Sequence, residues 1–197
     1  MSFFSIFPLI GYACLIRLNI SQNNCKNFDL CLSVAFVTSA LFLFGIFHFL
    51  LFGYYLIFII GILILLYFFL KKNYSFSRKR YSYFILISFL FYIVADFVHL
   101  KVWDDFFWGQ FTKSIYLENK IYTANSILQN HPRYTPGIPL FQNFFIFYLN
   151  KFQDKLLIFS NMMIVLSYAF IFFDFDIKQK NQLLLRIFTI LFFLVIL

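Results

Sequence analysis

The sequence predicts an all-α fold, a polytopic transmembrane helical bundle, and three observations support that prediction. Hydrophobic residues make up 62% of the 197 residues, and charged residues only 12%. A water-soluble domain normally carries about twice that charged fraction, so the composition excludes a soluble globular protein. Several apolar runs also approach the roughly 20 residues that a helix needs to cross the hydrocarbon core of a bilayer. Many of the 34 phenylalanines fall within these runs.

We expect about six membrane spans, separated by short polar segments. The apolar runs cover residues 3–16, 30–52, 54–70, 82–100, 156–173 and 183–197. Gly53 is the expected turn between the second and third spans. The chain then divides into N-terminal transmembrane helices (1–100), an external loop (101–155) and C-terminal transmembrane helices (156–197). Because the last run reaches the final residue, we interpret the chain as a portion of a longer protein or a short member of its family.

The basic residues predict the orientation of the bundle. The gap between the third and fourth spans contains no acidic residue and five basic ones: Lys71, Lys72, Arg78, Lys79 and Arg80. Lys and Arg in short loops mark the cytoplasmic side of a membrane protein. If the spans alternate, the remaining basic gaps fall on that side too: Arg17 with Lys26, and Lys178 with Lys180 and Arg186. Residues 101–155 are then external, and the net charge of +8 requires no nucleic-acid partner.

One external stretch, residues 101–143, differs in kind from the rest of the chain. It contains both tryptophans and three of the four prolines. Apolar residues between 106 and 117 predict a short helix that lies at the membrane interface. Pro136-Gly137 predicts a turn, and a second interfacial helix is expected to begin at Pro139 or Leu140.

Two adjacent carboxylates, Asp104 and Asp105, follow the predicted fourth span at its outer end. Neighbouring carboxylates repel each other and lose hydration near lipid, so one of them is suited to take a proton from a hydroxyl. The alternative interpretation is a pair of solvated loop acids beside interfacial tryptophans. Asp96 and His99 lie one helical turn apart in the fourth span, where they either pair with each other or meet water.

Cationic and polar residues in the same loop are candidates for binding a phosphate. Arginine binds phosphate through two parallel hydrogen bonds, and lysine binds it as a point charge. The candidates are Lys113, His131, Arg133 and Gln142. The alternative for each is a contact with lipid headgroups that has no catalytic role. The three cysteines, Cys14, Cys25 and Cys31, have no metal-binding spacing, so we interpret them as inert thiols and name no metal-ligating residues.

The arrangement of this loop resembles that of the GT-C superfamily of multi-spanning glycosyltransferases. The features that carry the resemblance are the acidic pair, tryptophan, lysine and Pro-Gly-x-Pro-Leu, in order along the chain. The matching stretches are Trp-Asp-Asp-Phe at 103–106 and His-Pro-Arg-Tyr-Thr-Pro-Gly-Ile-Pro-Leu-Phe-Gln at 131–142. In that superfamily a membrane helix delivers an acidic motif into the first large external loop. An interfacial helix follows, and a Pro-rich element then begins another amphipathic helix.

The resemblance implies a GT-C-like fold and transfer of a sugar from a polyprenyl-phosphate-linked donor to an acceptor outside the membrane. Asp104 or Asp105 would be the general base, and the phosphate-binding candidates would hold the donor. The resemblance implies no required cofactor. It leaves open whether a divalent metal takes part, because members of the superfamily differ in their metal dependence. The implied location is a bacterial inner (plasma) membrane. Two alternatives are a non-catalytic polytopic membrane protein and a polysaccharide polymerase or transport component.

Overall fold

The computed structural model describes residues 2–20, 23–71, 78–98, 109–123, 126, 135–149 and 151–172. Within these ranges all regular secondary structure is helical, with no strand, which confirms the predicted all-α class. The α-helices are α1 (Ile6–Asn19), α2 (Asp29–Ile46), α3 (Leu50–Leu70), α4 (Arg78–Val94), α6 (Gln110–Glu118), α7 (Gly137–Phe144) and α8 (Asp154–Ala169). Short 3-10 helices precede α1 and α2 and follow α8: η1 (Ser2–Ser5), η2 (Asn23–Phe28) and η4 (Phe170–Phe172).

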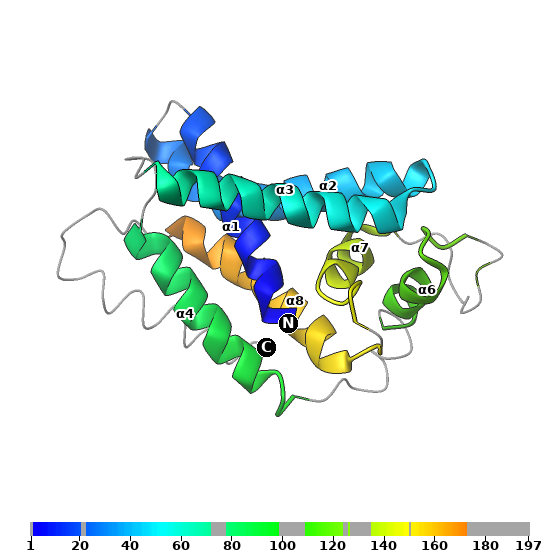
Figure 1. Cartoon of the computed structure of the whole chain (residues 1–197). Helices are drawn as coiled ribbons and strands as arrows, with labels where there is room; N and C mark the ends of the chain where they lie inside the picture. Colours follow the sequence, from blue (N-terminus) through cyan, green and yellow to red (C-terminus); the bar gives the residue numbers. More distant parts are fainter. Residues whose placement is uncertain are drawn as a thin grey trace.

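The helices alternate in direction, so that the bundle has two distinct ends (Figure 1). α2 and α3 lie side by side, and α1 crosses them. α8 packs against α2, α4 and α7. At one end, α1, α3 and α8 finish where α2 and α4 begin; α6 and α7 lie towards the other end. The two ends differ in chemistry, as described below.

Two of the described helices are long and apolar enough to cross a membrane. They are the continuous segment Lys26–Ile46, which includes α2, and α3 at Leu50–Leu70, each of 21 residues. The other expected spans are shorter in the described residues: α1 has 14 residues, α4 has 17 and α8 has 16. The expected span at 183–197 lies outside the described residues.

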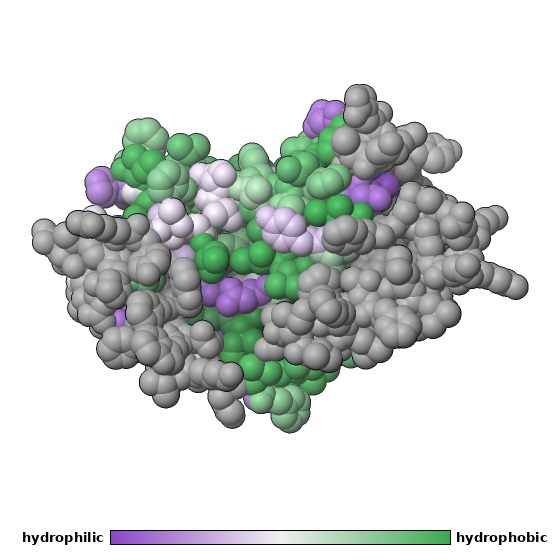
Figure 2. Space-filling view, turned by 180° about the vertical axis from the view of Figure 1, so that it is seen from behind, coloured by the Kyte–Doolittle hydropathy of each residue, from purple (hydrophilic) through white to green (hydrophobic). Residues whose placement is uncertain are grey.

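The outward faces of α2 and α3 are apolar. On α3, the exposed side chains include Leu63, Phe69 and Leu70, the last of which is 79% exposed. Figure 2 shows that hydrophobic residues also dominate the described surface on the face behind the view of Figure 1. Exposed contiguous apolar surface of this extent marks contact with a membrane or with other protein.

The turn between α2 and α3 lies at residues 47–49, and the predicted turn at Gly53 is wrong. His48 adopts a left-handed conformation with φ 61°, which is the backbone change that reverses the chain. Gly53 lies inside α3 at a tight contact, where an added Cβ would be 2.5 Å from Cγ of Phe44. This glycine is therefore a packing position between the two helices.

The crossing of α1 and α3 is built on two glycines. A Cβ added to Gly11 would lie 2.0 Å from the backbone oxygen of Gly61, and one added to Gly61 would lie 2.6 Å from Cβ of Pro8. The hydroxyl of Tyr12 donates a hydrogen bond to the carbonyl of Ile57 at 2.8 Å beside this crossing. Small residues that bring two helix backbones into contact are typical of membrane helix pairs.

The two predicted loop helices are present as α6 and α7, but α7 is buried. α6 is amphipathic, as expected of an interfacial helix, because Phe111 and Ile115 are buried while Lys113 is exposed. α7 begins at Gly137, with Pro139 in its first turn, and packs between α2, α6 and α8. Every residue from Pro139 to Phe144 is buried. The second expected helix is therefore present and largely covered by neighbouring helices, with Ile138 exposed, and its position at the membrane interface remains a prediction.

Candidate functional site

Four polar side chains meet where α6, α7 and α8 pack together. The hydroxyl of Thr112 on α6 donates a hydrogen bond to Oε1 of Gln142 on α7. Nε2 of Gln142 donates in turn to Oδ1 of Asn161 on α8 at 3.0 Å. Nδ2 of Asn143 donates to the carbonyls of Thr112 at 2.9 Å and Pro139 at 3.0 Å. We call these four side chains the amide network.

The amide network fixes α7 relative to its two neighbours. The side chains of Thr112, Gln142 and Asn143 are at most 1% exposed. A buried amide without partners costs about 1–3 kcal/mol, so these groups favour the one helix arrangement in which they are all paired. The network thereby holds the beginning of α7, which carries the Pro-Gly-x-Pro-Leu element, in a defined place.

Side chains from α3 and η1 hold the backbone of α7 from the other side. The hydroxyl of Tyr54 donates to the carbonyl of Leu140 at 3.5 Å, and that of Ser5 donates to the carbonyl of Phe144 at 3.3 Å. The ring of Tyr54 also stacks on Phe147, with 5.2 Å between the ring centroids. Buried helix carbonyls need such partners wherever water is excluded. The carbonyls of Leu140 and Phe144 therefore have side-chain partners within the protein.

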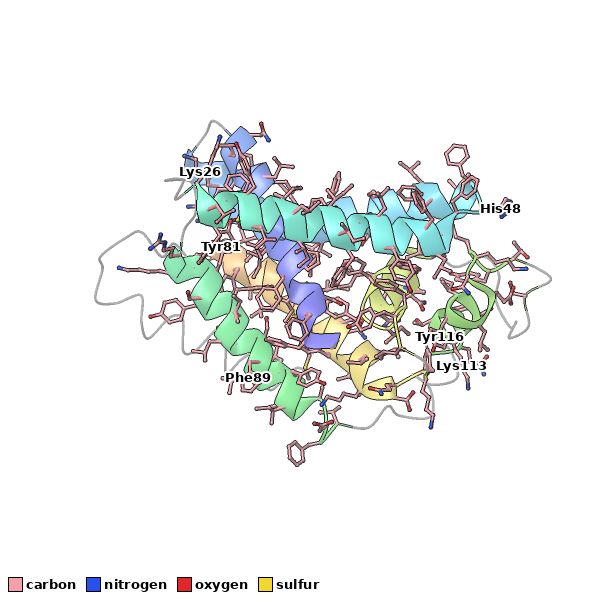
Figure 3. All side chains as sticks on the ribbon, viewed as in Figure 1. Lys26, His48, Tyr81, Phe89, Lys113 and Tyr116 are labelled. Atoms are coloured by element: carbon pink, nitrogen blue, oxygen red, sulfur yellow. The ribbon has the colours of Figure 1, made fainter. Side chains whose placement is uncertain are left out.

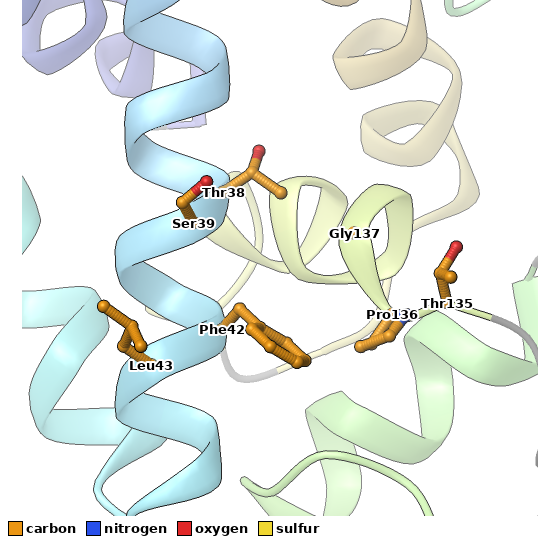
Figure 4. Close-up of a pocket in the computed structure, with 7 residues that line it drawn as sticks. All are labelled: Thr38, Ser39, Phe42, Leu43, Thr135, Pro136 and Gly137. Atoms are coloured by element: carbon orange, nitrogen blue, oxygen red, sulfur yellow. The ribbon is translucent and has the colours of Figure 1, made fainter.

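A pocket of about 410 Å³ lies between α2 and the start of α7 (Figure 4). Its wall on α2 is formed by Thr38, Ser39, Phe42 and Leu43, and its wall at α7 by Thr135, Pro136 and Gly137. No charged side chain lines it among the described residues. Its chemistry suits an apolar chain, with a few hydroxyls at its edge.

Only some of the predicted site residues lie in the part of the chain that the structure describes. Asp104, Asp105, His131 and Arg133 lie outside the described residues, as does His99, so the catalytic pair remains a prediction. Lys113 is exposed on α6, at the end of the bundle opposite Lys26 and Tyr81 (Figure 3). Gln142 is buried in the amide network. The structure thus gives Lys113 access to solvent or lipid headgroups and gives Gln142 partners within the protein.

Asp96 pairs with α8 near the same end. Its carboxylate lies 2.5 Å from Nζ of Lys155, and that ammonium lies 3.8 Å from the centre of the Tyr92 ring. The Asp96 side chain is 57% exposed, so this is a surface ion pair. In the described residues, no group of three or more His, Cys, Asp and Glu side chains is arranged to hold a metal ion.

Burial also affects one phenol in the segment that follows α6. Tyr122 is buried against Phe111, with 4.8 Å between the ring centroids. Burial raises the pKa of Tyr122 to about 12, because the charged phenolate would lose its hydration. The phenol therefore stays protonated at neutral pH and acts as a packing group.

A cluster of buried charged residues lies at the other end of the bundle, and the sequence did not predict it. Nη2 of Arg80 is 2.9 Å from Oδ1 of Asp29, and the hydroxyl of Tyr81 donates to Oδ2 of the same carboxylate at 2.8 Å. Nη1 of Arg17 lies 3.6 Å from Oδ2. Nη1 of Arg80 also donates to the carbonyl of Phe170 at 2.9 Å. We call Arg17, Asp29, Arg80 and Tyr81 the buried charge cluster.

The buried charge cluster joins α1, α2, α4 and η4 at one end of the bundle. Asp29 is completely buried and Arg80 is 1% exposed. The one available signal was a lone aspartate at the start of an apolar run, because such a charge needs a partner when it is buried. Two of its partners, Arg80 and Tyr81, lie 51 and 52 residues further along the chain, a separation over which a single sequence carries no pairing information.

Comparison with known proteins gives no match, whether with family models, with curated proteins or with solved structures. The functional interpretation therefore depends on the residues of this chain.

Proposed function

We propose that this chain is a multi-pass membrane glycosyltransferase, or a portion of one, that uses a polyprenyl-phosphate-linked sugar donor on the external side of the membrane. The observation that carries the proposal is the placement of the Pro-Gly-x-Pro-Leu element. It begins a buried helix and lines an apolar pocket at Thr135, Pro136 and Gly137. Ligand sites are mostly apolar and largely pre-formed, so an apolar pocket beside a fixed backbone suits the lipid part of such a donor.

The distribution of basic residues between the two ends of the bundle supports the proposed orientation. Lys71, Arg78 and Lys79 lie at one end, where α3 finishes and α4 begins. α6 and α7 lie towards the opposite end, where Lys113 and Tyr116 are found (Figure 3). Basic residues face the cytoplasm in membrane proteins, so the α6–α7 end is proposed to be external.

The proposed reaction is a single displacement at the anomeric carbon of the donor sugar. Asp104 or Asp105 takes the proton of the acceptor hydroxyl while the acceptor oxygen forms a bond to that carbon. The bond from the anomeric carbon to the phosphate oxygen breaks, and the polyprenyl phosphate leaves with the electron pair. Lys113, His131 and Arg133 are proposed to stabilise the charge that develops on the phosphate.

The test is sugar transfer by membranes that contain the full chain, supplied with a panel of polyprenyl-phosphate-linked sugars. Asp104→Asn and Asp105→Asn are made separately, with Asp154→Asn as the matched control, because Asp154 is an exposed acid at the start of α8. We expect one of the first two variants to lose transfer while membrane insertion and the control activity persist. Full activity in both variants would remove the catalytic assignment and favour a non-catalytic membrane protein.

A further inference from the structure

The end of the bundle that carries the buried charge cluster also has exposed cations. Lys71 follows α3 directly, and Arg78 and Lys79 begin α4; all three side chains are exposed. None of the three forms an ion pair within the described residues. Lys26 and Tyr81 lie at the same end (Figure 3). We call Lys71, Arg78 and Lys79 the basic rim.

The only acidic side chain at this end in the described residues does not weaken the basic rim. Asp29 is completely buried, and its carboxylate lies between Arg80 at 2.9 Å and Arg17 at 3.6 Å. Two arginines and one carboxylate leave one positive charge in the cluster. The carboxylate is therefore compensated internally, and the exposed charges at this end of the bundle are positive among the described residues.

The basic rim lies next to apolar surface. Phe69 and Leu70, the last two residues of α3, are 65% and 79% exposed. Nζ of Lys71 lies 4.7 Å from the centre of the Tyr67 ring, one turn back on the same helix. A tyrosine and a lysine beside exposed aliphatic residues are typical of headgroup depth, where the apolar stem stays in lipid and the charged group reaches the phosphates.

We infer that the basic rim is a binding surface for anionic phospholipid headgroups. The charge complementarity argues for this partner, because the rim offers several cations that no described carboxylate offsets. The adjacent exposed apolar residues argue for a lipid, which has an acyl chain to cover them, over a soluble polyanion. This inference rests on the membrane placement proposed above and does not depend on glycosyl transfer.

The test uses the full chain reconstituted in phosphatidylcholine bilayers with trace spin-labelled lipids. Electron paramagnetic resonance gives the fraction of each lipid whose motion is restricted by the protein. We expect the association constant of phosphatidylglycerol to exceed that of phosphatidylcholine at low salt, and the excess to fall as ionic strength rises. A juxtamembrane cation strengthens the binding of an anionic lipid about fivefold. Electron paramagnetic resonance averages this effect over all lipid positions around the protein, so the measured ratio changes by less.

The variants localise the effect to the basic rim. Lys71→Gln/Lys79→Gln should lower the ratio of the two association constants at least about twofold. Lys71→Arg/Lys79→Arg should retain the ratio, because the charge is kept. The matched control, Lys120→Gln/Lys151→Gln, removes two exposed lysines from the segments that flank α6 and α7 and should leave the ratio unchanged.

Each other outcome overturns the inference. A ratio of one in the unmodified chain, or a ratio that the glutamine variant leaves unchanged, removes the basic rim as a lipid-binding surface while the membrane placement stands. An equal fall in the control variant shows that the selectivity is not local to the rim. The absence of any restricted lipid component contradicts the membrane placement itself.

Discussion

Arg80 and Asp29 form a buried ion pair, with 2.9 Å between Nη2 and Oδ1, at the junction of α2 and α4. Taking both charges out of water is costly, and removal of one partner leaves the other uncompensated. We therefore expect Asp29→Asn to destabilise the protein by about 3–5 kcal/mol. The measurement is thermal unfolding in detergent of a chain in which Cys25 and Cys31 are replaced by serine, followed through the reaction of a thiol dye with Cys14, which is 1% exposed in the folded chain.

Two comparisons identify charge burial as the cause. Lys79→Gln removes an exposed charge one residue from Arg80 and should leave the unfolding midpoint unchanged. The double variant Asp29→Leu/Arg80→Met removes both charges and should cost less than Asp29→Asn alone. An unfolding midpoint of Asp29→Asn equal to that of the unmodified chain would contradict the stabilising role of the pair.

Asp96 and Lys155 make an ion pair of the same chemistry at the surface. The Asp96 side chain is 57% exposed, so solvent screens the attraction. Asp96→Asn should therefore change stability by less than about 1 kcal/mol in the same unfolding assay. Comparison of Asp29→Asn with Asp96→Asn thus separates the effect of charge burial on stability from the effect of ion pairing alone. A larger loss of stability for Asp96→Asn than for Asp29→Asn would show that solvent exposure does not determine how much an ion pair contributes to stability.

The glycines at the crossing of α1 and α3 give a third prediction. Gly11→Ala would place a Cβ 2.0 Å from the backbone oxygen of Gly61, and helix backbone cannot move aside cheaply. We expect a destabilisation of about 1–3 kcal/mol from overpacking. Gly137→Ala is the matched control, because its nearest neighbour would be Cγ2 of Thr38 at 3.6 Å, an ordinary contact. Similar midpoints for the two variants would mean that the helices do not cross closely here.

The amide network gives the fourth prediction. Asn143→Leu removes the donor to the carbonyls of Thr112 and Pro139 while keeping the branched shape of the side chain. The loss should be about 1–3 kcal/mol, because the two buried carbonyls lose their side-chain donor. Gln153→Ala, at an exposed residue before α8, is the control. Unchanged unfolding of Asn143→Leu would show that the network does not hold α7 in place.

Helix positions could be predicted from the sequence because long apolar runs favour helices whatever their neighbours are. The expected run at 54–70 lies within α3, and the expected loop helix between 106 and 117 overlaps α6. The turn was missed because Gly53 is the usual residue for a turn, whereas His48 carries no such signal. Here glycine serves close packing, and the left-handed backbone falls on a histidine.

The burial of α7 and the charge pairing could not be predicted, since both depend on contacts between distant segments. Gln142 and Asn143 are polar residues that periodicity would place on a wet face, but Thr112 and Asn161 pair with them. Arg80 was interpreted only as part of an orientation signal, whereas its main contact is Asp29. Of the candidate site, Lys113 and Gln142 are placed by the structure, and the carboxylate pair remains a prediction.

The most direct test of the account is to label two cysteines on intact cells with a membrane-impermeant thiol reagent. Cys14, Cys25 and Cys31 are first replaced by serine, and Lys151→Cys or Lys79→Cys then places one exposed thiol at either end of the bundle. We expect Lys151→Cys to react from outside, and Lys79→Cys to react only after the membrane is permeabilised. Labelling of Lys79→Cys from outside with protection of Lys151→Cys, or equal labelling of both, would contradict the proposed orientation and the external site.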